Sequence, residues 1–550
     1  MNAPDPTAAA PRVRVADQGL LIRGALLADG TGAEPDHRDV LVTGDRVAAV
    51  EPPGRIPDQG RRVVDATGQV LAPGFVDVHS HSDNAPLYGP GDLPKLLQGV
   101  TTEVVGNCGF SLAPFTDTRQ VRDYAAVTFP PELPFTWRGF ADLFKATDAA
   151  GYITNYVPLV GHGTVRSMVC GGTARPARAE ELREMGRAVA EACDAGCFGL
   201  SSGLAYSPGS FADTAELTSL VRHMPRHGIY ASHIRSEGPG LLDSLREAVR
   251  IGHETGRRVQ ISHLKVPGRG SPDRAEQVLG LLRRARREGL AVAQDIYPYT
   301  AASLMLSACL PRWAHDGGGA ALLTRLADPR LVERMRAEVE EHTDGGGGAE
   351  GGDWDNHVAS AGYRSIRVAS TATGTYDGQA LTDLAAALGM APFDTLVHIV
   401  RHEENRANMI VDTVSDDDIA ALLRDEHTML GTDGAPPGWG TSPHPRVSGT
   451  FPRLLRRFVR DLRVLSLPAA VARMTSLPAD TFGLADRGRV RVGAVADLVI
   501  FDPQEVQDRA TYDSPLRPPE GIGKVLVGGQ VVVDGGRWTG RRTGARLTPG

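Results

Sequence analysis

The middle of the chain alternates short apolar runs with longer stretches in which apolar residues recur at helical spacing. This alternation favours βαβ units and a parallel sheet. We predict strands over residues 70–79, 101–107, 155–162, 198–204, 229–234, 258–264, 290–299 and 428–434. Amphipathic helical patterns lie between them, as in residues 177–196. Because a closed (β/α)8 barrel needs eight such strands, the pattern predicts an α/β fold with a barrel over residues 67–484.

The two ends of the chain show a different pattern of apolar and polar residues. Short alternating runs, separated by Gly, Asp and Pro, fill residues 13–66, and the same pattern is found over residues 485–540. Such runs are typical of small antiparallel β units. We predict that both ends build one small β domain split in sequence, with two separate β units as the alternative. Residues 1–12 are predicted to be a disordered lead.

One interval between consecutive predicted strands is too long for the βα repeat of the barrel. About 130 residues lie between Tyr299 and Thr428, where about 30 would complete a βα unit. Within the interval, residues 345–348 are GGGG and residues 331–342 form a charged helical pattern. We predict an insertion at about 312–370, near the mouth of the barrel. Loops on the C-terminal face of a barrel shape its active site, so this insertion is expected to act as a lid.

Length, charge and cysteine content narrow the class of protein. The 550 residues fit either several domains or one large barrel with a small domain, and they carry a net charge of −7. Without a long basic tract, nucleic acid and anionic membrane are poor partners. No apolar run reaches about 18 residues, and the N-terminus lacks the apolar core of a secretory signal. The five cysteines show no disulfide spacing, which favours a cytoplasmic location.

Potential metal ligands follow the ends of the predicted strands. They are His79, His81, Cys108, His233, His263 and Asp433. His79 and His81 are two positions apart on one strand end, so their rings face the same side. The carboxyl ends of parallel strands meet at one mouth of a barrel, where imidazole, thiolate and carboxylate together suit Zn²⁺. A single histidine at such a place is more often a core residue, but six ligand-type residues at one rim indicate a metal site.

Several phrases resemble those of a known family. They are APGFVDVHSHSD (72–83), GVTTEVVGNCGFSLAP (99–114), VGHGTVR (160–166), GLSSGLAYSPGSFA (199–212), YASHIRSEG (230–238), QISHLK (260–265), GTDG (431–434) and HPRVSGTFPR (444–453). The first resembles the amidohydrolase superfamily, and together they resemble its N-acyl-D-amino-acid deacylases, or D-aminoacylases. The similarity runs from about residue 15 to 535. It implies a distorted (β/α)8 barrel, a β-sandwich built from both termini, and hydrolysis of N-acyl-D-amino acids to a carboxylate and a D-amino acid.

The resemblance also implies roles for the ligand-type residues. A tightly held zinc ion is expected on Cys108, His233 and His263. A second site, weak or empty in that family, would comprise His79, His81 and Asp433. The predicted fourth strand reads FGLSSGL and lacks the carboxylated lysine of many amidohydrolases. Zn²⁺ acidifies water and polarises an amide carbonyl, and Asp433 is expected to act as base and then as acid.

Three further residues are expected to bind the small N-acyl amino acid substrate. The family resemblance assigns this role to Lys265, Tyr297 and Arg446, with Tyr299 as the alternative to Tyr297. Arg446 suits the α-carboxylate because a guanidinium binds a carboxylate in a bidentate manner. A surface salt bridge for Lys265 and an ordinary packed ring for Tyr297 are the alternatives. His444 is expected to be exposed, with substrate binding as the alternative.

Other functions compatible with this pattern stay open at the level of the sequence. One is hydrolysis of a cyclic amide, as in dihydroorotases and hydantoinases, which the missing lysine disfavours. Another is deacylation of a peptide-like intermediate of specialised metabolism by the same chemistry. A barrel that binds no metal and serves as a scaffold is a third. The oligomeric state and the preferred side chain and acyl group are likewise open.

Overall fold

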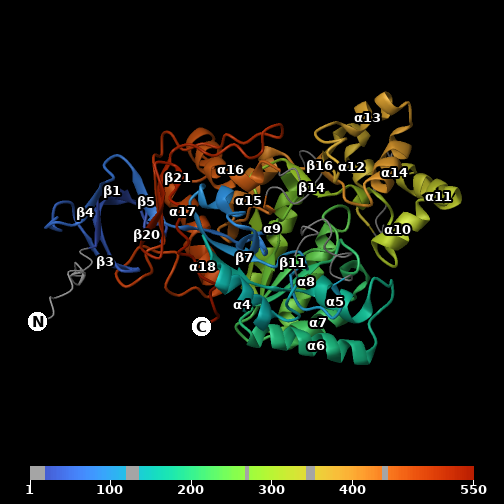
Figure 1. The fold of residues 1–550 in the computed structure, drawn as a ribbon, viewed down its shortest axis with the longest axis horizontal. Coiled ribbons are helices and arrows are strands. Elements are labelled where there is room, and N and C mark those ends of the chain that lie inside the picture. The colour runs from blue at the N-terminus through green and yellow to red at the C-terminus, as the bar shows by residue number, and fades with distance from the viewer. Residues whose placement is uncertain (1–18, 119–134, 267–271, 342–353, 437–443) are drawn as a thin grey trace, which may run out of the picture.

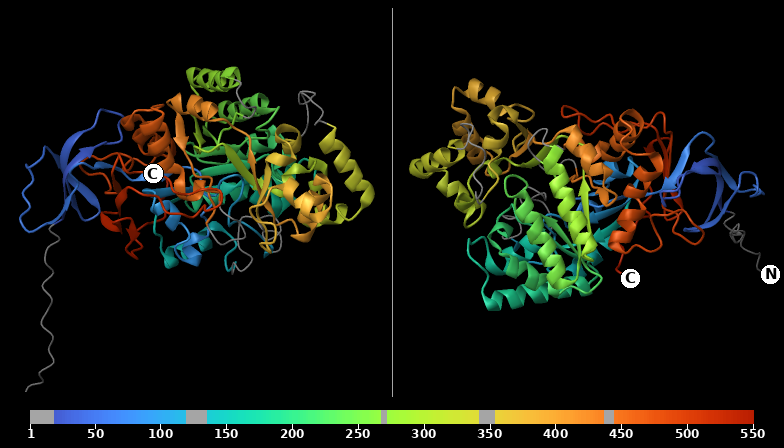
Figure 2. Two further views of the ribbon diagram at one scale, coloured as in Figure 1. Left: turned by 90° about the horizontal axis from the view of Figure 1, so that it is seen from above. Right: turned by 180° about the vertical axis from the view of Figure 1, so that it is seen from behind.

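The computed structural model describes residues 19–118, 135–266, 272–341, 354–436 and 444–550, so the predicted lead 1–12 lies outside the described residues. The fold is mixed α/β (Figure 1). Blue and red strands from the two ends of the chain lie together at one end of the molecule, and the yellow-to-orange helices project at the other. Parallel strands and helices occupy the centre, and the two further views show the same division (Figure 2).

Two parallel sheets form the centre. The first has the order β17-β13-β12-β11-β10-β9 and the second the order β6-β7-β8. Their bounds are β6 Phe75–Asp77, β7 Val100–Val105, β8 Asn155–Pro158, β9 Val160–Gly161, β10 Gly199–Gly203, β11 Ile229–His233, β12 Arg258–Ile261, β13 Val292–Ile296 and β17 Thr428–Leu430. A parallel bridge between Ser80 and Gly434 links the end of β6 to the residues after β17. Each of the eight predicted strand positions therefore contains a strand.

Helices surround these sheets. Their bounds are α1 Ala85–Tyr88, α2 Leu93–Leu96, α4 Phe140–Ala150, α5 His162–Cys170, α6 Ala179–Asp194, α7 Thr214–Arg222, α8 Leu241–Thr255, α9 Pro272–Arg287, α15 Asp416–Arg424, α16 Arg446–Arg453, α17 Leu467–Met474 and α18 Ser476–Phe482. Helix α8 shows why they form: Leu241, Leu245, Ala248 and Ile251 recur every three or four residues and are all buried. The helix ends at Gly256, which has the left-handed conformation that glycine adopts without a steric penalty.

Strands from both ends of the chain share one further sheet. Its order is β21-β20-β19-β18-β5-β1-β2-β3, with β4 beside β1. The bounds are β1 Leu20–Leu27, β2 Asp36–Thr43, β3 Arg46–Glu51, β4 Arg62–Asp65, β5 Val70–Pro73, β18 Leu498–Phe501, β19 Ile522–Val527, β20 Gln530–Asp534 and β21 Arg537–Trp538. The single strand predicted over 70–79 is thus two strands in two sheets. They part at Gly74, where a Cβ atom would lie 2.2 Å from the Thr101 hydroxyl.

A separate unit with its own core interrupts the centre between β13 and β17. Its sheet has the order β14-β16-β15, with β14 Ala301–Met305, β15 Ile366–Ser370 and β16 Asn408–Asp412. Its helices are α10 Gly319–Arg325, α11 Pro329–Glu340, α12 His357–Ala361, α13 Leu381–Leu388 and α14 Pro392–His402. Leu306, Met335 and Phe393 are among the residues of its core. We call this unit, Ala301–Asp412, the insertion; the predicted segment 312–370 lies inside it, and its GGGG run lies outside the described residues.

No single helix in the described part of the chain is long and apolar enough to cross a bilayer. Helices α13 and α14 satisfy the length and composition criteria only when taken together, and they are bent by 91°.

Candidate metal centre

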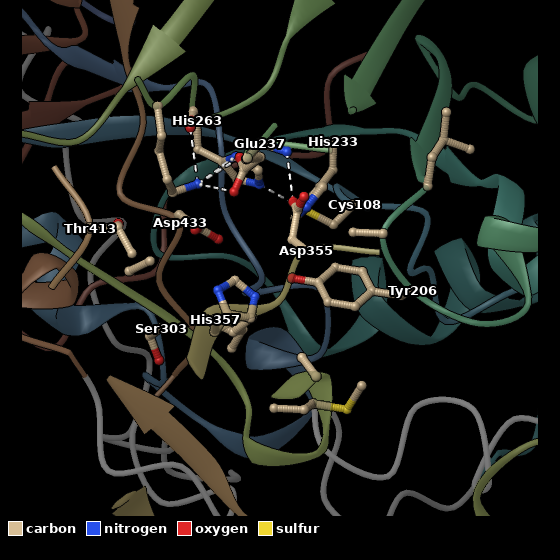
Figure 3. Close-up of a pocket in the computed structure, with 18 of the residues that line it drawn as sticks. Cys108, Tyr206, His233, Glu237, His263, Ser303, Asp355, His357, Thr413 and Asp433 are labelled. Carbon is tan, nitrogen blue, oxygen red and sulfur yellow. Dashed lines mark hydrogen bonds and ion pairs between the residues drawn. The ribbon is translucent and has the colours of Figure 1, made fainter. Parts of the chain in front are cut away.

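The six ligand-type residues of the sequence analysis come together at the C-terminal ends of the central strands. Figure 3 shows four of them, Cys108, His233, His263 and Asp433. They form two groups that share Cys108: His79, His81, Cys108 and Asp433, and Cys108, His233 and His263. Within each group the candidate ligand atoms all lie within 4.8 Å of one another. Residues that are more than 350 positions apart in the chain, such as His79 and Asp433, therefore meet as the parallel strands predict.

Cys108 lies at the middle of the cluster. Its Sγ is 3.2 Å from His79 Nε2 and 3.4 Å from His263 Nε2, and only 4% of the residue is exposed. Burial favours the neutral thiol, but His79 and His263 outweigh it and hold the pKa of Cys108 well below its usual range. His233 Nδ1 is buried with no hydrogen-bond partner in the described residues. A buried thiolate among imidazoles, one of them with an unused nitrogen, fits Zn²⁺.

The backbone at three candidate ligands is strained. Cys108 has a φ of 53°, His263 of 33° and Asp433 of 48°. These left-handed conformations are uncommon for residues with a side chain, and they concentrate at functional sites. Close backbone packing accompanies them: a Cβ on Gly203 would lie 2.1 Å from the carbonyl oxygen of Cys108. The turns after β7, β12 and β17 thus aim ligand side chains inward at a conformational cost.

Asp295, at the end of β13, connects two of the candidate ligands. Its Oδ1 accepts a hydrogen bond from the His263 backbone N–H at 2.9 Å and lies 3.6 Å from His79 Nδ1. A carboxylate beside the second nitrogen of a metal-binding imidazole orients the ring. Asp295 is fully buried and was not identified from the sequence, where nothing separates it from other acidic residues after a strand.

Asp433 is held between a histidine and an arginine. Its Oδ1 is 3.2 Å from His81 Nε2, and its Oδ2 is 2.8 Å from a terminal nitrogen of Arg446. Burial raises the pKa of Asp433, but Arg446 and the nearby histidines outweigh it and keep the pKa well below its usual range. The group is therefore a carboxylate at neutral pH, in contact with the guanidinium predicted to bind substrate.

Lys265 forms an ion pair with an acidic residue of the site. Its Nζ lies 2.8 Å and 3.1 Å from the two carboxylate oxygens of Glu237, a residue that sequence reasoning missed. Glu237 Oε1 also lies 3.0 Å from His263 Nδ1. The only signal available was its position in the phrase YASHIRSEG, four residues after His233. The Lys265–Glu237 pair thus carries little net charge beside the cluster.

The tyrosines of DIYPY lie in different surroundings. The ring of Tyr297 is 4.7 Å from Arg446 Cζ and 5.4 Å from Lys265 Nζ, so it contacts both predicted substrate cations. Its hydroxyl is buried with no partner in the described residues. Tyr299 instead donates to the Pro445 carbonyl at 3.4 Å and packs under Arg453. Of the two rings, that of Tyr297 is therefore the one that packs on both Lys265 and Arg446.

The prediction that His444 is exposed is wrong. The residue is 4% exposed; its Nδ1 accepts from the Arg446 backbone N–H at 3.0 Å, and its Nε2 donates to the Ala301 carbonyl at 3.1 Å. Burial, with Arg446 nearby, lowers the pKa of His444 well below its usual value, so the ring is neutral. The flanking Pro- and Gly-rich residues suggested an exposed loop, but His444 positions the backbone of Arg446.

A cavity of about 250 Å³ opens onto the cluster. Its lining includes Cys108, His233, His263, Asp433, Lys265 and Arg446. The insertion supplies much of the rest of the lining, including Ser303, Leu304, Met305, Trp354, Asp355 and His357. Figure 3 shows His357 and Tyr206 reaching into the space below Glu237 and His263. The candidate metal ligands therefore face a chamber of the size of a small organic molecule, partly closed by the insertion.

These features define a metal-dependent hydrolase of the amidohydrolase type, and comparison with known proteins agrees. The model of the amidohydrolase family matches residues 62–533, and the chain belongs to that family. It is 36% identical to the N-acyl-D-aspartate deacylase of Alcaligenes xylosoxydans xylosoxydans, over 97% of this chain and 96% of the relative. It is 34% identical to the D-aminoacylase of the same organism, over 96% and 97%. The crystal structure of N-acyl-D-glutamate deacylase from Bordetella bronchiseptica, complexed with zinc and a phosphonate mimic of the tetrahedral intermediate, superposes with a TM-score of 0.80. That protein is 33% identical, with 96% of this chain and 99% of the other covered.

Proposed function

We propose that this protein hydrolyses the amide bond of N-acyl-D-amino acids and releases a carboxylate and a free D-amino acid. The observation that carries the proposal is the convergence of Cys108, His233 and His263 on one cavity. The full-length relatives named as N-acyl-D-aspartate deacylase and D-aminoacylase support the same chemistry and the D-configuration of the substrate.

We propose zinc as the metal, held tightly by Cys108, His233 and His263, with His79, His81 and Asp433 as a weaker second site. The mixed sulfur and nitrogen donors support zinc over hard cations, which prefer oxygen ligands. When bound, the ion supplies acidification of water and polarisation of the amide carbonyl. The zinc complex of the Bordetella bronchiseptica relative is consistent with this assignment.

The chain's own residues then have distinct tasks. Asp433, a carboxylate at the rim of the cavity, would accept a proton from the attacking water and deliver it to the departing amine. Arg446 would bind the α-carboxylate of the substrate, sharing its guanidinium with Asp433. Lys265 is already paired with Glu237, so it would contribute a donor rather than a free charge. The unpartnered hydroxyl of Tyr297 is a further donor beside Arg446.

We also propose that the two central sheets together form a distorted (β/α)8 barrel over about 67–484. The eight strand positions, the consecutive strands β8 and β9, and the bridge between Ser80 and Gly434 support closure. The sheet shared by the two termini would form a small β-sandwich domain from about 13–66 and 485–540. Its buried cluster, which combines residues of β1 and β2 with residues of β18 and β19, supports one domain over two.

The proposed function is tested with purified protein, zinc analysis and a panel of N-acetyl-D- and N-acetyl-L-amino acids. We expect Cys108→Ala to lose zinc and turnover together. We expect Asp433→Asn to keep zinc at the tight site and to lose roughly 10²–10⁴-fold in kcat, the usual contribution of a general base. Cys170→Ala, a buried cysteine at the end of α5, serves as the control.

Three results would contradict the proposal. Normal turnover rates in Cys108→Ala and Asp433→Asn would contradict the roles assigned to these two residues. Turnover of hydantoins without turnover of acyl amino acids would identify a cyclic-amide hydrolase. A wild-type protein that binds no zinc and hydrolyses nothing would indicate a scaffold.

A further inference from the structure

The insertion docks on the residues that follow the ligand strand β11. Asp355, just before α12, accepts hydrogen bonds from the Ser236 hydroxyl at 2.6 Å and from the Glu237 backbone N–H at 2.8 Å (Figure 3). The same Ser236 oxygen accepts from the backbone N–H groups of Gly238 and Gly240, at 3.2 Å and 3.1 Å. A single carboxylate of the insertion therefore completes the turn that presents Glu237.

Glu237 in turn contacts a candidate metal ligand. Its carboxylate lies 3.0 Å from His263 Nδ1, while His263 Nε2 faces Cys108 Sγ at 3.4 Å. If Nε2 holds a metal, Nδ1 must carry the ring proton, and this proton needs an acceptor. Lys265 Nζ is also 3.0 Å from Nδ1, but an ammonium group has only donors. Glu237 is therefore the group that fixes the orientation and tautomer of His263.

We propose that Asp355 is a positioning residue that acts on His263 through Glu237, so that docking of the insertion is linked to metal affinity. The chain of contacts is continuous: Asp355 to the Ser236–Glu237 backbone, the Glu237 carboxylate to His263 Nδ1, and His263 Nε2 to Cys108. This inference rests on the proposed zinc hydrolase function and adds a residue of the insertion to the groups that set the metal site.

Another contact between the insertion and the central part of the molecule provides a matched comparison. Asp316 Oδ1 accepts from the Ala174 backbone N–H at 2.8 Å, which is the same type of bond as that from Asp355 to Glu237. Ala174, however, lies in the segment after α5, which carries no candidate ligand. A general loss of docking would affect both contacts, whereas the proposed linkage is specific to Asp355.

The test is the zinc affinity of the metal-free full-length protein, measured by competition with a chromogenic chelator. We expect Glu237→Gln to weaken zinc binding by roughly 10–100-fold, the usual effect of removing a carboxylate behind a ligand histidine. Asp355→Ala is expected to weaken it by roughly tenfold, at the lower end of that range, while Asp316→Ala leaves it unchanged. Because Asp355 acts through Glu237, the double variant should bind zinc no more weakly than Glu237→Gln alone. Saturating zinc should restore most of the turnover of Asp355→Ala.

Wild-type affinity in Asp355→Ala, or effects that multiply in the double variant, would overturn the inference. If Asp355→Ala does not fold, as judged by its thermal unfolding, Asp355→Asn is measured instead and should weaken binding in the same direction. A wild-type protein without zinc affinity would overturn the proposed function itself. Zinc binding and turnover in the wild type, together with unaltered affinity in the Asp355 variants, would overturn the positioning role alone.

Discussion

At the scale of single residues, Lys95 shows how a buried charge supports the candidate centre. Its ammonium group, in a residue that is 1% exposed, lies 3.1 Å from Asp77 Oδ2 and 3.2 Å from Glu103 Oε2. Asp77 accepts from the backbone N–H groups of His79 at 3.2 Å and Thr432 at 2.8 Å. One ion pair thereby ties the strand end that bears His79 to the strand end that bears Asp433.

Replacement of Lys95 by Met should be strongly destabilising. It leaves the Asp77 and Glu103 carboxylates buried without a cation, and breaking a buried pair costs about 3–5 kcal/mol. Calorimetry should show a clearly lowered Tm. Lys145→Met, which removes the exposed partner of Asp142, should leave the Tm almost unchanged. Equal decreases in Tm for the two substitutions would show that the buried ion pair stabilises the fold no more than the exposed one.

A half-buried histidine of the insertion predicts a pH dependence of stability. Burial lowers the pKa of His315 to about 4, and its Nε2 donates to the Ser307 carbonyl at 3.2 Å. The folded state therefore favours the neutral ring. The resulting stability is complete above the unfolded pKa of about 6.5 and is lost as the pH falls from there towards 4.

His315→Gln should make the free energy of unfolding less dependent on pH between pH 6.5 and 4. The slope should decrease by up to about 1.4 kcal/mol per pH unit. Urea unfolding followed at several pH values measures the slope. His253→Gln, at an exposed position on α8, is the control. An unchanged slope in His315→Gln would mean that the ring is not held neutral in the folded protein.

At the scale of elements, the insertion wall of the cavity predicts a substrate preference. Leu304 and Met305 of β14 and the neutral side chain of Ser303 line it, and Thr413, the residue after the insertion, also lines the cavity. Burial lowers the pKa of His357, so this residue is also neutral. Arg235 and Arg312 also line the cavity. The guanidinium of Arg235 is engaged by the carboxylate of Glu247 at 3.0 Å and 2.8 Å and by two carbonyls. That of Arg312 donates to the Ser210 carbonyl at 2.5 Å and packs on the Phe211 ring.

We therefore expect higher kcat/KM for N-acetyl-D-leucine than for N-acetyl-D-aspartate, because a side-chain carboxylate would be desolvated without a dedicated counter-charge. A difference of at least roughly tenfold, or about 1.4 kcal/mol in transition-state binding, is expected. Steady-state kinetics on both substrates measure it. Preference for the acidic substrate would show that Arg312 or Arg235 turns from its present partners to the side-chain carboxylate of the substrate.

The strand-end pattern predicted the gathering of His79, Cys108, His263 and Asp433 because parallel strands fix where their carboxyl ends lie. It did not identify Glu237, since a carboxylate in an irregular turn leaves no periodic signal. The positions of the central strands were predictable from apolar runs. The division of 70–79 at Gly74 was not, because it depends on the approach of Thr101 from another strand. The extent of the insertion was obscured because only four residues separate the end of β13 from the start of β14, so the first residues of β14 look like a continuation of the same barrel segment.

At the scale of the whole molecule, the C-terminal tail is part of the central structure. Leu547 N–H donates to the Tyr156 carbonyl at 2.8 Å, and Tyr156 N–H donates to the Ala545 carbonyl at 2.9 Å. Arg546 forms an ion pair with Asp148 at 3.0 Å. Tyr156 also donates through its hydroxyl to the Ser82 carbonyl at 2.9 Å, next to His81. The tail therefore stabilises β8, and Tyr156 of β8 in turn holds the backbone next to His81.

Removal of residues 541–550 should lower the Tm by several degrees, because the main-chain partners of β8 are lost. Thermal unfolding of the truncated protein measures this, and Arg546→Ala tests how much of the loss the ion pair explains. An unchanged Tm in the truncated protein would show that the tail binds too weakly to matter. We expect the single substitution to have the smaller effect, since main-chain pairing is retained.

The sheet shared by the two ends of the chain also bears on biosynthesis. Val70 of β5 pairs with Phe501 of β18, so an edge made early on the ribosome acquires its partner only when translation is nearly complete. The insertion, by contrast, has its own core, so we expect it to fold before β18 is synthesised. A nascent chain stalled before β18 should thus expose the unpaired β5 edge to chaperones, while the insertion is already resistant to protease.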